Sequence, residues 1–144
     1  MLVTGNLPPS GLIKNMDGDS LNLANLKGKY TYIGFCSLNN IGCQQEFEYL
    51  KYFFFKQGKY LDILVIVPES ERKQIESFTD EHSIPWKFWF GVNDQKILND
   101  YNVKAYPVFF LLDREGKLLM SPAPLPSAGF EKQLFGILRG KGEI

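Results

Sequence analysis

The sequence has few residues of the kinds that build disulfide scaffolds and structural metal sites. Its 144 residues include two cysteines, Cys36 and Cys43, and one histidine, His82. Two cysteines are too few for a disulfide scaffold. A structural zinc site needs four cysteine or histidine ligands, so this composition argues against one. We expect no metal and no cofactor in this chain.

The sequence also lacks an excess of either charge and any long apolar run. Lysine and arginine total 16, and aspartate and glutamate total 16, so the composition gives no electrostatic case for binding nucleic acid. No apolar run approaches the ~20 residues that a membrane-spanning helix needs. Residues 1–11 do not combine a basic region with an apolar core, as a signal peptide would. A mature form, an excised domain and a cytosolic protein all remain open.

The sequence does contain enough apolar material for one folded domain. Hydrophobic residues make up 44% of the chain and aromatic residues 15%, which excludes disorder as the overall state. A length of 144 residues suits a single domain with a real core. We expect one domain over residues 1–144, without an internal repeat or a domain boundary.

Strands and helices alternate along the chain. Continuous apolar runs at 30–36, 61–67 and 108–112 predict buried strands. The first two flank a helical pattern at 40–57, which indicates a parallel βαβ unit, and a four-residue turn after the third predicts an antiparallel hairpin. We therefore expect an α/β fold with a mixed central sheet, helices on both faces and an added N-terminal β-hairpin. The other predicted elements are two short edge strands around a turn at 16–19, strands at 87–90 and 117–120, a proline-rich loop at 121–127, and helices at 69–82, 94–101 and 128–138.

The helix predicted at 40–57 begins with a good capping residue. The side chain of Asn40 can accept a hydrogen bond from an amide of the first helical turn. One face of this helix is apolar and is expected to face the core; it carries Cys43, Phe47, Leu50 and Phe54.

The order of these elements and several short motifs resemble the thioredoxin superfamily. The motifs are GDSLNLANLKGK at 18–29, YTYIGF at 30–35, CQQE at 43–46, YNV at 101–103, YP at 106–107 and FFLLDREGKLL at 109–119. Within the superfamily, the chain is most similar to the TlpA/ResA-type extracytoplasmic thiol-disulfide oxidoreductases. The resemblance covers nearly the whole chain. It implies a thioredoxin fold, a place in the periplasm or cell envelope, and protein or peptide partners that include thiol and disulfide proteins.

The segment that should carry the redox site departs from that family. The family has a Cys-x-x-Cys pair at the start of the helix, and Cys43 matches its second cysteine. Asn40 occupies the position of the first cysteine, which is the nucleophile. Glu46 matches the acidic residue three positions after the second cysteine, and Cys36 lies where the family has a tryptophan. Gly34 lies where cytosolic thioredoxins carry a buried aspartate that shuttles protons.

These departures imply an impaired dithiol mechanism. Exchange needs an exposed thiolate of low pKa that attacks the substrate disulfide, and a second thiol that resolves the mixed disulfide. Asparagine at position 40 can cap a helix, but it cannot attack sulfur. The resemblance also makes Pro107 the family's cis-proline, which would lie against the Asn40 end of the helix. Tyr106 would then be the residue whose backbone pairs with an extended substrate.

Several of these residues have simpler interpretations, which stay open. Cys43 is either a reactive thiol near a helix start or, as we favour, a small buried core residue. A Cys36–Cys43 disulfide needs Cα atoms within ~7 Å, which the sequence does not establish. Glu46 either tunes Cys43 or, as we favour in the absence of a dithiol, is a solvated helix residue. Pro107 is otherwise a proline that opens a strand.

Three functions are compatible with this sequence. We favour a thioredoxin-like domain that is impaired in dithiol exchange and binds protein or peptide partners. The alternatives are a one-cysteine redox enzyme that uses Cys43, and a purely structural domain of a cell-envelope protein. A peroxiredoxin-like peroxidase fits less well. The threonine that precedes the cysteine of that family by three positions is Asn40 here, and the arginine expected near Tyr106 is absent.

Overall fold

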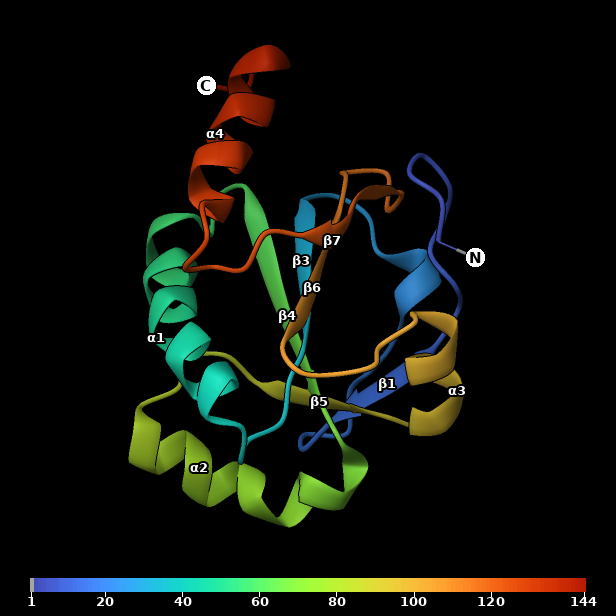
Figure 1. Cartoon of the computed structure of the whole chain (residues 1–144), viewed down its shortest axis with the longest axis vertical. Coiled ribbons are helices and arrows are strands. Elements are labelled where there is room, and N and C mark those ends of the chain that lie inside the picture. The colour runs from blue at the N-terminus through green and yellow to red at the C-terminus, as the bar shows by residue number, and fades with distance from the viewer. Residues whose placement is uncertain (1) are drawn as a thin grey trace.

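Seven strands form one mixed sheet at the centre of the molecule (Figure 1). The computed structural model describes residues 2–144. The strands lie side by side in the order β2-β1-β5-β4-β3-β6-β7. Their bounds are β1 Leu12–Asn15, β2 Ser20–Asn22, β3 Tyr30–Phe35, β4 Leu61–Val67, β5 Phe88–Gly91, β6 Val108–Leu112 and β7 Leu118–Ala123.

The three most apolar strands form the middle of the sheet. β3 is buried along its whole length and pairs in parallel with β4 and antiparallel with β6. A strand that is covered on both faces has to be apolar on both, which explains its nearly continuous apolar and aromatic run. β1 and β2 form the N-terminal hairpin, and β1 pairs antiparallel with β5. The predicted mixed sheet with an added hairpin is therefore confirmed.

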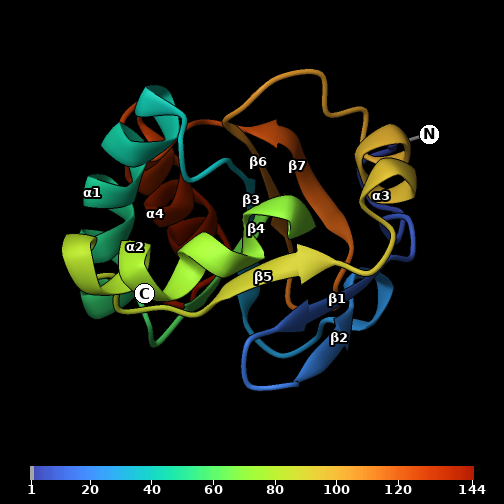
Figure 2. The ribbon, with the colours of Figure 1, turned by 90° about the horizontal axis from the view of Figure 1, so that it is seen from below.

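Helices cover both faces of the sheet, as Figure 2 shows. Their bounds are α1 Ile41–Lys56, α2 Ile75–His82, α3 Asp94–Asp100 and α4 Phe130–Gly140, with short 3-10 helices η1 Leu23–Asn25 and η2 Glu69–Gln74. α1, α2 and α4 pack on one face, in a core cluster that includes Cys36 and Cys43. α3 and η1 pack on the other face through Ile97, Tyr101 and Leu23. No helix among residues 2–144 is both long and apolar enough to cross a bilayer.

Three elements differ from the sequence-based predictions. The helix expected at 69–82 is a 3-10 helix followed by α2, and the Glu71 amide bonds to the Pro68 carbonyl with 3-10 spacing. β1 lies inside the sheet between β2 and β5, so it is not an edge strand. β7 continues to Ala123 and takes in part of the proline-rich segment. Pro122 is tolerated there because β7 is an edge strand whose register with β6 is irregular.

The buried face of α1 also ends on a different phenylalanine from the one predicted. Phe54 is 36% exposed, whereas Phe53 is 4% exposed. The Phe53 ring lies 5.8 Å from the ring of Phe130 in α4, measured between centroids. Both phenylalanines satisfy helical spacing from Leu50, so the tertiary contact with α4 decides which one is buried.

Candidate functional site

The candidate redox site lies where β3 ends and α1 begins (Figure 1). Residues 36–40 connect the two elements, and Asn40 is the N-cap of α1. Its backbone is extended, with φ −91° and ψ 122°, and its side-chain oxygen accepts a hydrogen bond of 2.9 Å from the Cys43 amide. This contact satisfies one of the amides that the first turn of a helix leaves without an internal partner. Asn40 thus caps the helix as predicted.

Cys36 and Cys43 are free thiols, and both are fully buried. The two side chains belong to the same core cluster. The Ser37 amide donates a hydrogen bond to the Cys43 sulfur, with 3.3 Å between its nitrogen and Cys43 Sγ. Hydrogen bonds donated to a sulfur favour its charged form. Of the two thiols, Cys43 is therefore the one placed to carry a negative charge.

The pKa values of the two thiols shift in opposite directions, because their surroundings differ. The neighbouring Cys36 thiol lowers the pKa of Cys43, and the Ser37 amide lowers it further, against the opposing effect of burial. Burial raises the pKa of Cys36 well above its usual range, and the neighbouring Cys43 thiol adds to the rise. The pKa of Cys43 is therefore lowered and that of Cys36 is raised relative to an ordinary thiol.

A buried carboxylate holds the loop that carries Ser37. Glu71, in η2, accepts hydrogen bonds from the Ser37 hydroxyl at 2.5 Å and from the Leu38 amide at 2.7 Å. The Leu38 carbonyl accepts a further hydrogen bond of 2.8 Å from the side chain of Gln44 in α1. The sequence gives no sign of this role, because Glu71 lies in a polar segment where a glutamate is expected to be solvated.

Pro107 lies beside the first turn of α1. The Tyr106–Pro107 peptide bond is cis, and a Cβ placed on Gly42 would lie 3.6 Å from Pro107 Cδ. Tyr106 is half-buried and packs against both core clusters, and burial is the main cause that raises its pKa. In the part of the chain that the structure describes, the Tyr106 amide and carbonyl have no backbone hydrogen-bond partner. The fold therefore brings Pro107 next to the helix start that carries Asn40 and Cys43.

Glu46 is buried, so the prediction that it is a solvated helix residue is wrong. One of its carboxylate oxygens accepts a hydrogen bond of 2.9 Å from the Ser127 amide, and the other accepts one of 2.7 Å from the Ser127 hydroxyl. These bonds tie α1 to the turn before α4. The charge of Glu46 raises the pKa of Cys43 less than any other cause acting on that thiol. The arrangement points to a structural role for Glu46.

We expect Glu46→Gln to destabilise the fold, because the glutamine amide nitrogen cannot accept a hydrogen bond and one Ser127 donor loses its partner. The free energy of unfolding, measured by urea denaturation, should fall by about 1–2 kcal/mol. Glu48→Gln is the matched control on the same helix, since among residues 2–144 its exposed carboxylate pairs only with Lys51, and it should change stability by no more than about 0.5 kcal/mol. Equal effects of the two substitutions would contradict a structural role for the Ser127 contact.

Gly34, which the sequence comparison above aligns with the buried aspartate of cytosolic thioredoxins, faces an aromatic ring. A Cβ placed on Gly34 would overlap the edge of the Phe109 ring and would lie 2.9 Å from Phe109 Cζ. Phe109 is the residue of β6 that is paired with Gly34 in the sheet, and it is fully buried. The space that an acidic side chain would need is therefore filled by Phe109.

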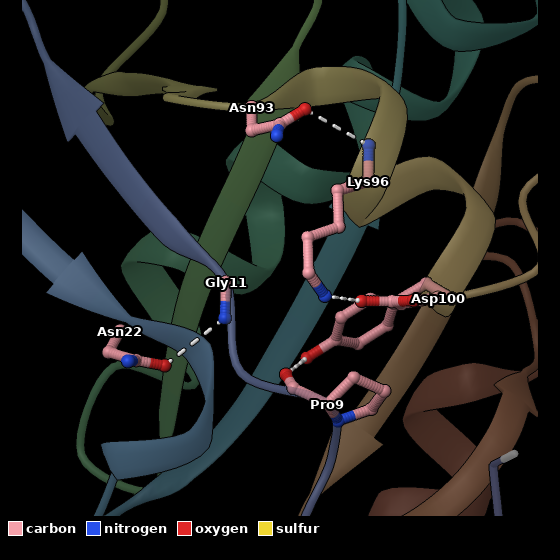
Figure 3. Close-up of polar contacts among 7 residues, drawn as sticks. Pro9, Gly11, Asn22, Asn93, Lys96 and Asp100 are labelled. Atoms are coloured by element: carbon pink, nitrogen blue, oxygen red, sulfur yellow. Dashed lines mark hydrogen bonds and ion pairs between the residues drawn. The ribbon is translucent and has the colours of Figure 1, made fainter.

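A cavity of about 930 Å³ lies apart from the thiols, between the N-terminal segment, α3 and the strands β6 and β7. Figure 3 shows polar contacts beside it: Lys96 pairs with Asp100 in α3, and the Pro9 carbonyl accepts a hydrogen bond of 2.6 Å from the Tyr101 hydroxyl. The contact between Pro9 and Tyr101 fastens the N-terminal segment to the C-terminal end of α3, whereas the Lys96–Asp100 pair lies within the helix. The lining includes none of the residues predicted for the redox site, so this cavity is not part of it.

The chain is similar in sequence to several thiol-disulfide oxidoreductases. The thiol-disulfide oxidoreductase ResA of Bacillus anthracis is 25% identical over 117 residues, which cover 80% of this chain and 66% of ResA. The thioredoxin-like protein YneN of Bacillus subtilis is 29% identical over 119 residues, which cover 78% of this chain and 66% of YneN. This chain therefore spans slightly less than two thirds of the length of these relatives.

The predicted thioredoxin fold is confirmed by solved structures. The thioredoxin domain of a thiol-disulfide oxidoreductase from Bacteroides vulgatus superimposes with a TM-score of 0.78 at 21% identity, covering 94% of this chain and 99% of that domain. A thiol:disulfide interchange protein from a Bacteroides species superimposes with a TM-score of 0.71 at 25% identity, covering 82% of this chain and 80% of that protein. The model of the AhpC/TSA family matches residues 5–120. The chain therefore belongs to the AhpC/TSA family, and its relatives there are thioredoxin-like thiol-disulfide oxidoreductases.

Proposed function

We propose that this chain is a thioredoxin-like domain in which dithiol exchange is impaired and which binds extended segments of protein partners beside Tyr106 and Pro107. The observation that carries the proposal is the hydrogen bond from the Cys43 amide to the Asn40 side chain. Asn40 uses its side chain to cap α1 at the position where the family has its attacking thiolate. A carboxamide accepts this hydrogen bond well, but it is not a nucleophile toward disulfides.

The two cysteines that are present do not replace the missing nucleophile. Cys36 and Cys43 are both 0% exposed. Attack on a disulfide of a protein partner requires an accessible thiolate, and neither enclosed sulfur meets this requirement. We therefore expect exchange with protein disulfides to stay at the background rate.

The main chain at Tyr106 supports the binding part of the proposal. Its amide and carbonyl lie just before β6 and have no backbone hydrogen-bond partner within residues 2–144. An extended peptide can use such groups by adding a short strand. Ile41, at the start of α1 and next to Gly42, is 71% exposed and offers an apolar contact.

The relatives of this chain indicate which class of partner it binds and where in the cell it acts. The relative ResA is a thiol-disulfide oxidoreductase whose alignment covers 80% of this chain, and the motifs quoted above resemble the extracytoplasmic members of its family. We therefore propose that the partners of this chain are proteins or peptides, including thiol and disulfide proteins. We also propose that the chain acts in the periplasm or cell envelope. The equal totals of 16 basic and 16 acidic residues disfavour nucleic acid as a partner.

A peptide-binding experiment tests this assignment. Insulin B chain with alkylated cysteines serves as an extended probe without thiols. We expect it to shift the amide NMR signals of Tyr106 and of residues 37–42 more than those of the N-terminal hairpin. Gly42→Leu should weaken binding at least about fivefold, because a side chain at this position projects toward Pro107 and obstructs the surface.

Gly136→Leu is the matched control, because nothing lies within 4 Å of a Cβ placed on Gly136 in α4. This variant should bind the probe as the native protein does. If saturating probe leaves the signals around Tyr106 unchanged, the binding surface is absent and a purely structural domain is the better explanation.

A one-cysteine redox enzyme that uses Cys43 is the second candidate. The hydrogen bond from the Ser37 amide favours it, because this bond and the neighbouring Cys36 thiol lower the pKa of Cys43. Such an enzyme would turn over small thiol or disulfide substrates in its native form, and Cys43→Ser would abolish this turnover. The function favoured above involves no such turnover.

A further inference from the structure

The outer face of α1 carries aromatic side chains that the rest of the described chain leaves uncovered. Tyr49 is 51% exposed, Tyr52 is 46% exposed and Phe55 is 75% exposed. Residues three positions apart are neighbours on a helix surface, so these rings form one row, which we call the aromatic stripe. α1 lies at the side of the molecule (Figure 1). Contiguous apolar surface of this kind marks interaction sites, and the proposed function gives the stripe no task.

The residues along this face are arranged symmetrically about Tyr52. Tyr49 and Phe55 lie three residues before and after it, and both are aromatic. Glu48 and Lys56 lie four residues before and after it, and they carry opposite charges. All four are exposed and flank Tyr52 on the same side of the helix. A two-fold rotation about Tyr52 therefore places aromatic residues on aromatic residues and each charge on its opposite.

Two copies of α1 packed antiparallel use this symmetry. Tyr49 of one copy then lies at the level of Phe55 of the other, and the two Tyr52 rings meet at the two-fold axis. Glu48 of each copy lies at the level of Lys56 of the other, so both charge pairs are attractive. A parallel arrangement would bring identical charges together, which repulsion disfavours. Contacts of the same patch with itself about a two-fold axis are the commonest form of association between identical chains.

The two charged groups are free to serve such a contact. Lys51 Nζ lies 2.9 Å from a carboxylate oxygen of Glu48, whose side chain is nevertheless mostly exposed. The Lys56 ammonium bonds to the Tyr52 hydroxyl and lies 4.9 Å from the centre of the Tyr52 ring. Contacts between exposed charged groups contribute little to stability, so these groups can turn toward a second copy at little cost.

We propose that the aromatic stripe of α1 is the contact surface of a homodimer, in which the α1 helices of two copies pack antiparallel about Tyr52. The aromatic rings supply the apolar contact, and the pairs of Glu48 with Lys56 set its direction and register. A contact made by one helix face of each copy belongs to the small interfaces. The association should therefore be weak, with a Kd of about 10–100 μM.

This contact is separate from the proposed peptide-binding surface. Ile41 lies eleven residues before Tyr52, which is about 16 Å along a helix. In the antiparallel pair the second α1 ends at the level of Glu48, so it does not reach Ile41, and Pro107 lies beside the first turn of α1. Failure of the peptide-binding experiment therefore leaves the dimer unaffected, and the reverse also holds.

Sedimentation velocity of the native chain tests the proposal. Between about 1 and about 500 μM, the weight-average sedimentation coefficient should rise from that of a monomer toward that of a dimer. Tyr52→Glu places two like charges at the two-fold axis and should weaken self-association at least about tenfold. Val92→Glu is the matched control, because Val92 is an exposed apolar residue in the turn between β5 and α3. It should associate as the native chain does.

Charge reversal tests the antiparallel register. Glu48→Lys brings two pairs of lysines together and Lys56→Glu brings two pairs of acids together, so each should weaken self-association at least about fivefold. The double variant restores opposite charges and should return to within about twofold of the native Kd. A native chain that stays monomeric throughout the concentration range would overturn the proposal, and this readout needs no variant. A double variant as weak as the single ones would overturn it as well.

Discussion

Replacing Asn40 with cysteine is expected to give the chain an insulin-reducing activity that the native sequence lacks. The new thiol would lie at the N-cap of α1, where free amides and the positive end of the helix dipole stabilise a thiolate. Cys43, one turn further along, would then be placed to resolve the mixed disulfide. We expect the rate to rise at least about tenfold above that of the native protein. Recovery should stay incomplete, because the family's flanking tryptophans are absent and the Tyr106 side chain crowds the site.

Insulin turbidity with a supplied dithiol reductant, at equal concentrations of the native and Asn40→Cys proteins, measures this effect. Asn40→Ser is the matched control, since serine keeps a capping oxygen but brings no thiol. Adding Cys43→Ser to Asn40→Cys should stop turnover at the mixed disulfide. If the native protein is as active as Asn40→Cys, the existing cysteines support catalysis and the proposed impairment is wrong. A folded but inert Asn40→Cys protein would mean that more than the nucleophile has been lost.

Placing aspartate at position 34, as in cytosolic thioredoxins, is expected to destabilise the chain severely. The Cβ alone would overlap the Phe109 ring. The carboxyl group would also enter an apolar cluster in which Phe109 stacks on Tyr32 with 4.7 Å between ring centroids. Overpacking and the burial of an unpaired acid together should lower the free energy of unfolding by about 4 kcal/mol or more.

Urea denaturation of three variants separates these two causes. Gly34→Ala introduces the overlap alone and should cost about 1–3 kcal/mol. Gly136→Asp makes the same chemical change on the open surface of α4, and its effect should stay within about 1 kcal/mol. A Gly34→Asp protein as stable as the native one would show that Phe109 moves aside freely and that this position still accepts an acid.

The interior of the fold could be predicted from the sequence because local rules dictate its residues. β3 is buried on both faces, so its continuous apolar run is enough to predict it as a strand. Asn40 marks the start of α1 because its side chain bonds to an amide only three residues away. Once these elements are placed, the right-handed crossover rule leaves few topologies.

The buried carboxylates could not be predicted in the same way. Glu71 bonds to Ser37 across 34 residues and Glu46 bonds to Ser127 across 81 residues. In the sequence both resemble solvated helix residues, because a carboxylate is buried only where the fold supplies donors for it. The proximity of the two thiols stayed undecided for a related reason, since it depends on how the loop at 37–40 joins β3 to α1.

The pairing of Gly34 with Phe109 makes positions 34 and 40 unequal in the number of changes that a new functional group requires. At position 40, one substitution exchanges a helix cap for a thiol without displacing a neighbouring side chain. At position 34, an acid needs space that the Phe109 ring occupies, so a smaller residue at position 109 has to come first. That intermediate would carry a cavity in the core and the lower stability that cavities bring. A thiol at position 40 therefore needs a single substitution, whereas an acid at position 34 needs a second substitution at position 109 that itself lowers stability.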